Sequence, residues 1–383
     1  MEINEMQKVL SATYRNKNLF SGFIHTLGVF ATRRLVITFD KIEFEFTHLP
    51  WGKICNWFLA EASFLFKTKK SWAYPTHYQM EPASGCNLRC PMCYITTQNI
   101  SRGTLSLNHF KKFIDEISDY AFLLHFWGWG EPFMNKDIFT MIKYAREKGL
   151  RVLTSTNAHF LAQEDITDKL IDSGLDALIV ALDGVDHQTY EHYRKQGDFD
   201  KVIGSVRLLT KRRKEKNTSL PMINLRMVVS RENEHQIPAM KALATDLGVD
   251  MLTLKTLWSH GNDGLWEKSL PVNHEYRRYS YDTEGRPIRK KNSCKRMWNH
   301  TMIHHDGSVT PCSYYLREES ELGKAFGAND ETFSRIWFSD AFRKTREDFL
   351  KFRNGRSPAH IRCQICGLNY TTPDGYVSHA FYF

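Results

Sequence analysis

The sequence contains 383 residues, enough for one large domain with attachments or for two modest domains. Its net charge of +9 is spread over basic patches without interleaved aromatic residues, so no nucleic-acid partner is expected. The N-terminus lacks the basic, apolar and small residues of a signal peptide, and no uncharged run is long enough to span a bilayer, which favours a cytoplasmic protein.

Residues 1–76 lack a regular alternation of strands and helices and are expected to form an N-terminal extension. The segment RRLVITFDKIEFEFTHL (33–49) predicts a β-hairpin, and WGKICNWFLAEASFLFK (51–67) predicts an amphipathic helix. This helix would either pack on the next domain, which we favour, or lie on a membrane surface as a peripheral contact. Cys55 within it is interpreted as buried filling rather than as a metal ligand.

Residues 77–257 alternate strand and helix patterns, which predicts parallel strands joined by crossover helices. The expected strands are HYQMEPA (77–83), FLLHFWGWG (122–130), RVLTSTN (151–157), ALIVALDG (177–184), MINLRMVVS (222–230) and DMLTLKTL (250–257). The expected helices lie near 106–120, 136–148, 164–173, 186–213 and 234–247. Six such units are fewer than the eight that close a full barrel, so the predicted fold class is α/β with an open, partial (β/α)6 barrel.

The carboxyl ends of these strands, where loops of neighbouring units converge, are the expected place for the chemistry. CNLRCPMCY (86–94) follows the first strand and contains Cys86, Cys90 and Cys93. The next three strands end in GWGEP (128–132), TSTNA (154–158) and ALDG (181–184). In a reducing compartment, cysteines at this density are metal ligands or catalytic groups more often than disulfides.

Three thiolates can hold three corners of a cubane [4Fe–4S] cluster, which normally takes four cysteines. One iron would keep an open coordination position, the feature that distinguishes a reactive metal site from a structural one. The alternatives are zinc with a distant fourth ligand and unligated thiols. The usual zinc pattern pairs two CxxC units, whereas here CxxxC precedes CxxC.

Residues 258–290 are polar and rich in turn residues, and we expect a linker there before a smaller domain at 291–383. That domain carries four cysteines in Cx17C and CxxC spacings, at Cys294, Cys312, Cys363 and Cys366. Four ligands make a closed site, either an iron–sulfur cluster or a structural zinc knuckle. Gly307 in GSVTPC predicts a tight hairpin that presents Cys312.

The CxxxCxxC motif after the first strand of a partial barrel resembles the signature of radical S-adenosylmethionine (SAM) enzymes, over residues 78–257. The resemblance implies that Cys86, Cys90 and Cys93 ligate a [4Fe–4S] cluster whose open iron binds SAM. Reductive cleavage of SAM then gives a 5′-deoxyadenosyl radical, which takes a hydrogen atom from the substrate. A reductant such as flavodoxin or ferredoxin is the implied partner.

The motifs at the other strand ends resemble the family's SAM-binding motifs at some positions and depart from them at others. The resemblance implies the cofactor-binding residues Gly130, Glu131, Pro132, Thr156, Asn157 and Arg194. In the family, the glutamate holds the methionyl amine of SAM, and an arginine pairs with its carboxylate, a role that suits a planar guanidinium. Three positions depart from the family's pattern: Trp129 and Ala158 each replace a usual glycine, and Ala181 replaces a usual serine.

The second cysteine set resembles the auxiliary-cluster extension called SPASM, or its shortened form, twitch. No cysteine follows Cys366, so the second auxiliary cluster of a full SPASM domain would have no ligands. The resemblance therefore favours twitch, with one auxiliary [4Fe–4S] cluster on the four cysteines. A fully ligated cluster has no position for substrate, so electron transfer or structural support is its expected role.

Together these features predict an enzyme that abstracts a substrate hydrogen, with oxidation by the auxiliary cluster as the expected outcome. The substrate is open: a small molecule, a ribosomally made peptide or a lipid. A non-catalytic iron–sulfur or zinc protein is the alternative from another class. Asp183 and His260 are the only candidates for a general base.

Overall fold

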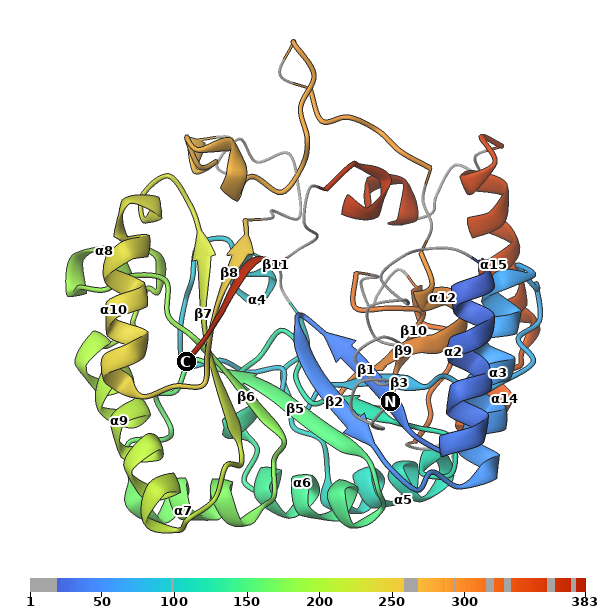
Figure 1. The fold of residues 1–383 in the computed structure, drawn as a ribbon, viewed down its shortest axis with the longest axis horizontal. Helices are drawn as coiled ribbons and strands as arrows, with labels where there is room; N and C mark the ends of the chain where they lie inside the picture. The colour runs from blue at the N-terminus through green and yellow to red at the C-terminus, as the bar shows by residue number, and fades with distance from the viewer. Residues whose placement is uncertain are drawn as a thin grey trace.

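A single large sheet forms the centre of the computed structural model (Figure 1). The structure describes residues 19–97, 100–257, 268–284, 286–291, 294–314, 320–326, 332–356, 362–372 and 377–383. Within them the sheet has nine strands, in the order β10-β9-β3-β4-β5-β6-β7-β8-β11. Their bounds are β3 His77–Met80, β4 Leu123–His125, β5 Arg151–Thr156, β6 Ala177–Ala181, β7 Met222–Val229, β8 Met251–Thr256, β9 His300–Ile303, β10 Val309–Thr310 and β11 Val377–Tyr382.

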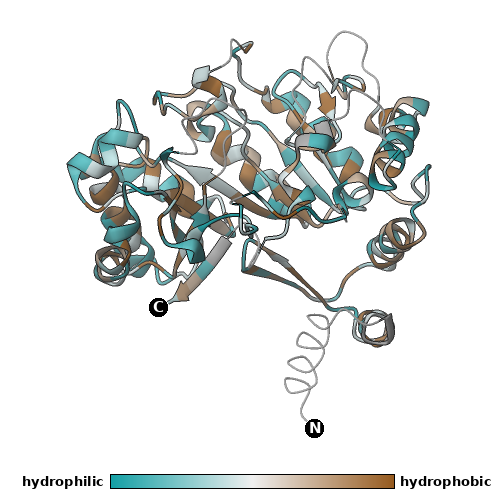
Figure 2. Cartoon of the chain, turned by 90° about the horizontal axis from the view of Figure 1, so that it is seen from above, coloured by the Kyte–Doolittle hydropathy of each residue, from teal (hydrophilic) through white to brown (hydrophobic). Residues whose placement is uncertain are grey.

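Strands β3 to β8 lie parallel and in sequential order, which confirms the predicted partial barrel. Each is shorter than its predicted segment, because the residues after it leave the sheet and form the loops of the site. The outer face is covered by α5 Leu107–Ile117, η1 Pro132–Met134, α6 Ile138–Glu147, α7 Glu164–Asp172, α8 His187–Tyr193, α9 Phe199–Glu215, η2 Glu234–Gln236 and α10 Ile237–Leu247. Seen from above, these helices are largely hydrophilic on the outside, and brown is concentrated toward the sheet (Figure 2).

The prediction of a single helix over 186–213 is wrong, because two helices form there. Helix α8 ends at Tyr193, and Asp198 begins α9 by accepting a hydrogen bond from the Lys201 amide at 2.9 Å. Between them the chain folds so tightly that a Cβ on Gly197 would lie 2.6 Å from the Arg194 carbonyl oxygen. The glycine and the aspartate N-cap therefore separate the two helices.

The predicted N-terminal hairpin is confirmed as β1 (Leu35–Phe39) and β2 (Ile42–Phe46), which pair antiparallel. Alternate residues of both strands are buried, as expected for a ribbon with one apolar face. That face packs on the inner side of the barrel, against Leu123, Leu153, Ile179 and Met251. We call residues 35–46 the hairpin plug, since in Figure 1 they lie in front of the barrel strands.

Along the chain, α2 (Leu19–Thr32) precedes the hairpin plug and α3 (Trp51–Leu65) follows it. Ile54 and Trp57 on α3 are buried, while Phe58 is exposed, so the helix packs along one face. Cys55 is exposed, which makes its interpretation as buried filling wrong: it lies one residue beyond the buried position 54 and points outward. No helix of the described chain is long and apolar enough to cross a bilayer, and contact of α3 with a membrane surface stays a prediction.

The C-terminal region extends both edges of the barrel sheet. Strand β9 pairs parallel with β3, and β11 pairs antiparallel with β8. The remaining elements are α4 Tyr94–Thr97, η3 His274–Tyr276, α12 Arg296–Asn299, α14 Phe333–Trp337, α15 Asp340–Arg353, η4 Arg362–Ile365 and η5 Gly367–Asn369. The hairpin predicted at Gly307 is confirmed: β9 and β10 pair antiparallel, and this glycine has a φ of 88°. The domain boundaries themselves stay a prediction.

Candidate active site

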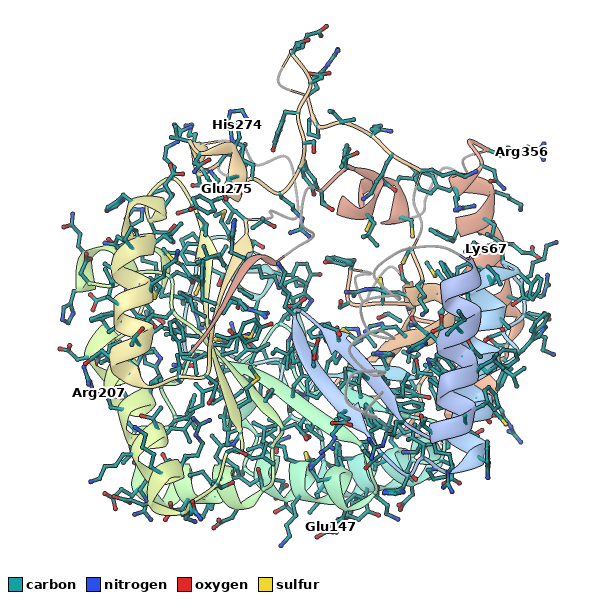
Figure 3. The ribbon with its side chains drawn as sticks, in the orientation of Figure 1. Lys67, Glu147, Arg207, His274, Glu275 and Arg356 are labelled. Atoms are coloured by element: carbon teal, nitrogen blue, oxygen red, sulfur yellow. The ribbon has the colours of Figure 1, made fainter. Side chains whose placement is uncertain are left out.

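A cavity of about 390 Å³ opens at the carboxyl ends of the barrel strands. Its lining includes Cys86, Cys90 and Cys93, and also Ser313 and Tyr314. Figure 3 shows the side chains, with this end of the barrel at the top. His274 and Glu275 lie on that side, and Glu147 lies at the opposite end. The cavity therefore lies where the sequence predicts the chemistry.

The three-cysteine loop brings its thiols together beside two predicted cofactor residues. The Asn157 side-chain amide lies 3.8 Å from the Cys86 sulfur, and Nη1 of Arg194 lies 3.9 Å from the Cys90 sulfur. Within the loop, the Cys93 amide donates to the Cys90 carbonyl at 3.1 Å. The turn thus directs the thiols toward the cavity, with a cation and an amide donor nearby.

Burial, with smaller contributions from Glu131, Cys93 and Cys90, raises the pKa of the Cys86 thiol to about 11. The effect of the two cysteines requires the three sulfurs to be near one another. The thiols fit the cationic core of an iron–sulfur cluster, which would favour the thiolates that burial disfavours.

Glu131 is the centre of the predicted SAM site. One carboxylate oxygen accepts a hydrogen bond from Thr156 Oγ1 at 2.7 Å, and the other accepts one from the Asn157 amide at 2.9 Å. Burial raises the pKa of Glu131 to about 7, even though these hydrogen bonds lower it. A cation beside the carboxylate would offset the burial, so the site fits the methionyl ammonium of SAM.

The loop that carries Glu131 depends on its two glycines. A Cβ on Gly130 would collide with the Ala83 carbonyl, and one on Gly128 would collide with the carboxylate of Glu81. Trp129 between them is accommodated because its ring packs on Tyr94, with the ring centroids 5.3 Å apart. Pro132, also predicted to bind cofactor, begins η1 and is buried behind the loop.

Arg194 and Asp183 form a buried ion pair. Nε and Nη2 of Arg194 both lie 2.5 Å from one oxygen of Asp183, whose other oxygen accepts from the Val228 amide at 2.7 Å. The carboxylate is 1% exposed, so it orients Arg194, and its prediction as a general base is not favoured by this pairing. His260, the other candidate base, lies outside the described residues.

Glu81 joins the SAM-site loop to the auxiliary region, a link that the sequence analysis missed. Its carboxylate accepts from the Trp129 amide at 3.3 Å and lies 3.2 Å from Nδ1 of His305 and 3.5 Å from Nδ1 of His304. Burial would raise the pKa of Glu81, but the hydrogen bonds to the two histidines outweigh it and lower the pKa to about 2. The only sequence signal was a charged residue at a strand end.

The second cysteine set is buried in an apolar cluster. Cys294, Cys312 and Cys363 pack with Trp298 and Phe349. Burial, with smaller contributions from Cys312 and Cys366, raises the pKa of Cys294 to about 12. All four cysteines are buried and free of disulfides, and their role as ligands of one cluster stays a prediction.

Across the described ranges, no three His, Cys, Asp or Glu side chains form a group that could hold one metal ion.

The hairpin plug and two barrel strands supply charged lining residues that the sequence analysis missed. Asp40, in the turn of the plug, accepts a hydrogen bond from Nη1 of Arg226 at 2.8 Å and lies 3.9 Å from Nζ of Lys255. All three residues line the cavity. The signal was present in the strands MINLRMVVS and DMLTLKTL, where a cation interrupts an otherwise nearly uncharged segment.

Comparison with known families agrees with this geometry. A model described as the radical SAM superfamily matches residues 80–244, and one described as the iron–sulfur cluster-binding SPASM domain matches residues 294–367. The chain contains a radical SAM domain followed by a SPASM domain. As a radical SAM enzyme it uses SAM and [4Fe–4S] clusters, and the assignment of the two cysteine sets as the cluster ligands stays a prediction.

This radical SAM enzyme resembles proteins of varied activity. It is 31% identical to an AdoMet-dependent heme synthase of Methanosarcina barkeri over 44% of this chain and 46% of that protein, so the match spans about half of the relative. It is 24% identical to the antilisterial bacteriocin subtilosin biosynthesis protein AlbA of Bacillus subtilis, over 77% of this chain and 68% of that protein. The SAM-bound structure of SuiB from Streptococcus suis shares the fold, with a TM-score of 0.56 and 14% identity over 79% of this chain and 73% of SuiB.

Proposed function

We propose that this radical SAM enzyme oxidises its substrate, with the auxiliary cluster on Cys294, Cys312, Cys363 and Cys366 as electron acceptor. Bound SAM, cleaved by one electron from a reductant such as flavodoxin or ferredoxin, supplies a carbon-centred radical that takes a hydrogen atom from substrate. The substrate would lose that hydrogen atom, then one electron to the acceptor and one proton to water or to a group of its own. These losses add up to a two-electron oxidation.

One observation carries the proposal: a single cavity connects the surroundings of the two cysteine sets. Its lining includes both Cys86 and Ser313, which directly follows the proposed auxiliary ligand Cys312. Arg296 also lines it, and this cation lowers the pKa of Cys294, so it lies near the auxiliary thiols. A substrate in the cavity would therefore lie between the proposed radical source and the proposed electron acceptor.

The protein's own residues would bind and orient SAM. Glu131 offers a buried carboxylate to the methionyl ammonium, and Thr156 and Asn157 hold that carboxylate in place. Asp183 fixes Arg194 next to the three-cysteine loop, where its guanidinium can meet the SAM carboxylate. The hairpin plug fills the inner side of the barrel, which limits the access of water to the cavity from the amino ends of the strands.

The test separates SAM cleavage from substrate oxidation. Cys312→Ser and Cys363→Ser proteins are reconstituted anaerobically, and iron, sulfide, 5′-deoxyadenosine and oxidised product are measured. We expect both variants to lose about half of the iron and still form deoxyadenosine, while product falls at least tenfold. Cys55→Ser, which removes the exposed cysteine outside both sets, is the matched control and should behave as the parent.

Oxidised product at the parental level without the auxiliary iron would overturn the acceptor role. Zinc instead of iron at the four auxiliary cysteines would overturn it as well.

A peptide substrate is the second candidate, supported by sequence relatives. The match to the subtilosin biosynthesis protein covers 77% of this chain, and the match to the mycofactocin maturase MftC of Mycolicibacterium smegmatis covers 68% at 24% identity. Under this proposal the cavity admits one side chain of a peptide whose remainder lies outside. Mass spectrometry of acidic and neutral peptides incubated with the reconstituted enzyme and SAM would show a mass loss of two hydrogens in a modified peptide.

A further inference from the structure

The lining of the cavity is rich in cations. Arg226 and Lys255, on β7 and β8, line it together with Arg278 and Arg296 from the C-terminal region. The acids in its described lining are Asp40, which contacts Arg226, and Glu131, which belongs to the predicted SAM site. This imbalance leaves a local excess of positive charge in a partly enclosed place, where a buried charge is costly without a counter-charge.

Arg226 indicates that the excess positive charge would meet a group that is not part of the protein. Its Nη1 donates to Asp40 at 2.8 Å, and its Nε donates to Thr253 Oγ1 at 3.0 Å. Its Nη2 is buried and has no hydrogen-bond partner in the described structure, and the residue as a whole is only 6% exposed. A buried guanidinium edge without an acceptor is unfavourable, so an incoming oxygen atom would stabilise it.

Lys255 lies on the neighbouring strand and faces the same space. Burial lowers the pKa of Lys255 to about 8; Asp40 raises it, whereas Arg226, Arg278 and Arg296 lower it further. The three arginines are thus near enough to repel the lysine ammonium. An anion between these cations would reverse the repulsion.

The four cations divide into two groups by what else they face. Nη1 of Arg296 donates to Oγ of Ser313, the residue after Cys312, at 3.3 Å, and a Cβ on Gly367, the residue after Cys366, would lie 3.4 Å from Nε of Arg278. Both arginines therefore lie beside the auxiliary cysteines. Arg226 and Lys255 instead project from barrel strands paired in register at Arg226–Thr253 and Val228–Lys255. An anionic auxiliary cluster would therefore compensate the first pair and leave the second pair for another anion.

We infer that the part of the substrate that enters the cavity is anionic and presents carboxylate or phosphate oxygens to Arg226 and Lys255. The inference rests on the proposed function in one respect, that this cavity is the substrate site. A hydrogen bond from the unpartnered Nη2 of Arg226 would fix one oxygen of the anion, and Lys255 would neutralise its charge. The anion would then place the rest of the substrate between the two cysteine sets.

The experiment measures binding of simple anions to the anaerobically reconstituted full-length enzyme with SAM, by isothermal titration calorimetry. Citrate and pyrophosphate are the probes, and sodium chloride at equal ionic strength is the control for screening. We expect saturable binding of at least one probe, weakened tenfold or more in Lys255→Met and kept within threefold in Lys255→Arg. Preference for citrate would identify carboxylates, and preference for pyrophosphate would identify phosphates.

Lys211→Met is the matched control, because Lys211 is an exposed cation of α9 with its side chain 67% exposed, far outside the cavity lining. This variant should bind the probes as the parent does. No saturable binding of either probe by the parent, or an equal loss in Lys211→Met, would overturn the inference. Circular dichroism shows whether the Lys255→Met protein folds. If it does not, the binding of the probes by Lys255→Glu, which reverses the charge, is compared with their binding by Lys255→Arg, which keeps it.

The same preparation separates this inference from the proposed function. Deoxyadenosine is measured in the parent without any probe. Deoxyadenosine formation with no anion binding would overturn the anionic substrate and leave the radical chemistry standing. Anion binding that depends on Lys255, with no deoxyadenosine, would support the anion site and contradict the proposed function.

Discussion

The two cysteine sets use the same thiol ligand in opposite surroundings. Cys86 and Cys93 are half-buried in a loop that lines the cavity, beside Arg194, Asn157 and a carboxylate. The four cysteines of the auxiliary set are buried, and three of them pack with Trp298 and Phe349. The difference teaches that access, rather than the thiols, distinguishes the two sites: the first three cysteines line the cavity, whereas none of the four auxiliary cysteines is in its described lining.

The largest effect is expected from the loss of one cysteine in the three-cysteine loop. Cys86→Ala, Cys90→Ala and Cys93→Ala each remove one of only three protein ligands, so reductive SAM cleavage should fall by at least a hundredfold. Deoxyadenosine is measured by chromatography after anaerobic reconstitution with dithionite. The Cys55→Ala protein should retain parental cleavage, and persistent deoxyadenosine in all three single variants would contradict the assignment.

A smaller effect is expected from the carboxylate of the SAM site. Glu131→Gln keeps the shape but removes the charge that would meet the ammonium, and should weaken SAM binding by about 10- to 100-fold. In the parent, the pKa of Glu131 is raised to about 7 by burial, so the charged form increases as the pH rises from 6 to 8. SAM affinity should therefore increase over that range.

Equilibrium dialysis with labelled SAM at pH 6, 7 and 8 measures this. The Glu131→Gln protein should show a flatter profile. A parent whose affinity falls with rising pH would show that Glu131 does not meet the ammonium.

The connection between the two regions is tested at Glu81. Glu81→Gln weakens the contacts to His304 and His305 and should lower the free energy of unfolding of the apoprotein by about 1–3 kcal/mol at pH 7. The pKa of Glu81 is lowered to about 2 in the fold, so its contribution is fully present above the unfolded value of 4.5 and is lost as the pH falls from there toward 2.

Urea unfolding at pH 7 and pH 4 gives both quantities. The parent should lose more stability between these pH values than the variant. Identical losses would mean that Glu81 does not couple the barrel to the hairpin of Cys312.

The smallest effect concerns a backbone position at the end of β5. Ala158 has a φ of 64°, in the left-handed region that disfavours a side chain, and it is fully buried beside Asn157. Ala158→Gly should raise the free energy of unfolding by about 0.5 kcal/mol, because relief of the strain slightly exceeds the greater entropy of glycine in the unfolded chain. A thermal melt compares it with Ala145→Gly, a buried helical position that should be destabilised instead.

Much of the fold and site could be predicted because it depends on local patterns. Strand and helix periodicity placed the six barrel strands, and cysteine spacing placed both ligand sets. The pairs Asp40–Arg226 and Glu81–His305 could not be predicted, since each joins residues more than 180 positions apart and depends on how the elements pack. Gly197 and Asp198 could have predicted the break in the helix over 186–213, but the amphipathic pattern of the segment led to the prediction of one helix.

The hairpin plug places one charged residue of the N-terminal extension in the wall of the cavity. Asp40 is in its two-residue turn, with both turn residues at positive φ, and its carboxylate holds Arg226 at the cavity. A change in this turn would alter the charge of the cavity without changing any barrel strand or the three-cysteine loop. The charge of the cavity can therefore be retuned from a ribbon that lies outside the barrel in the sequence.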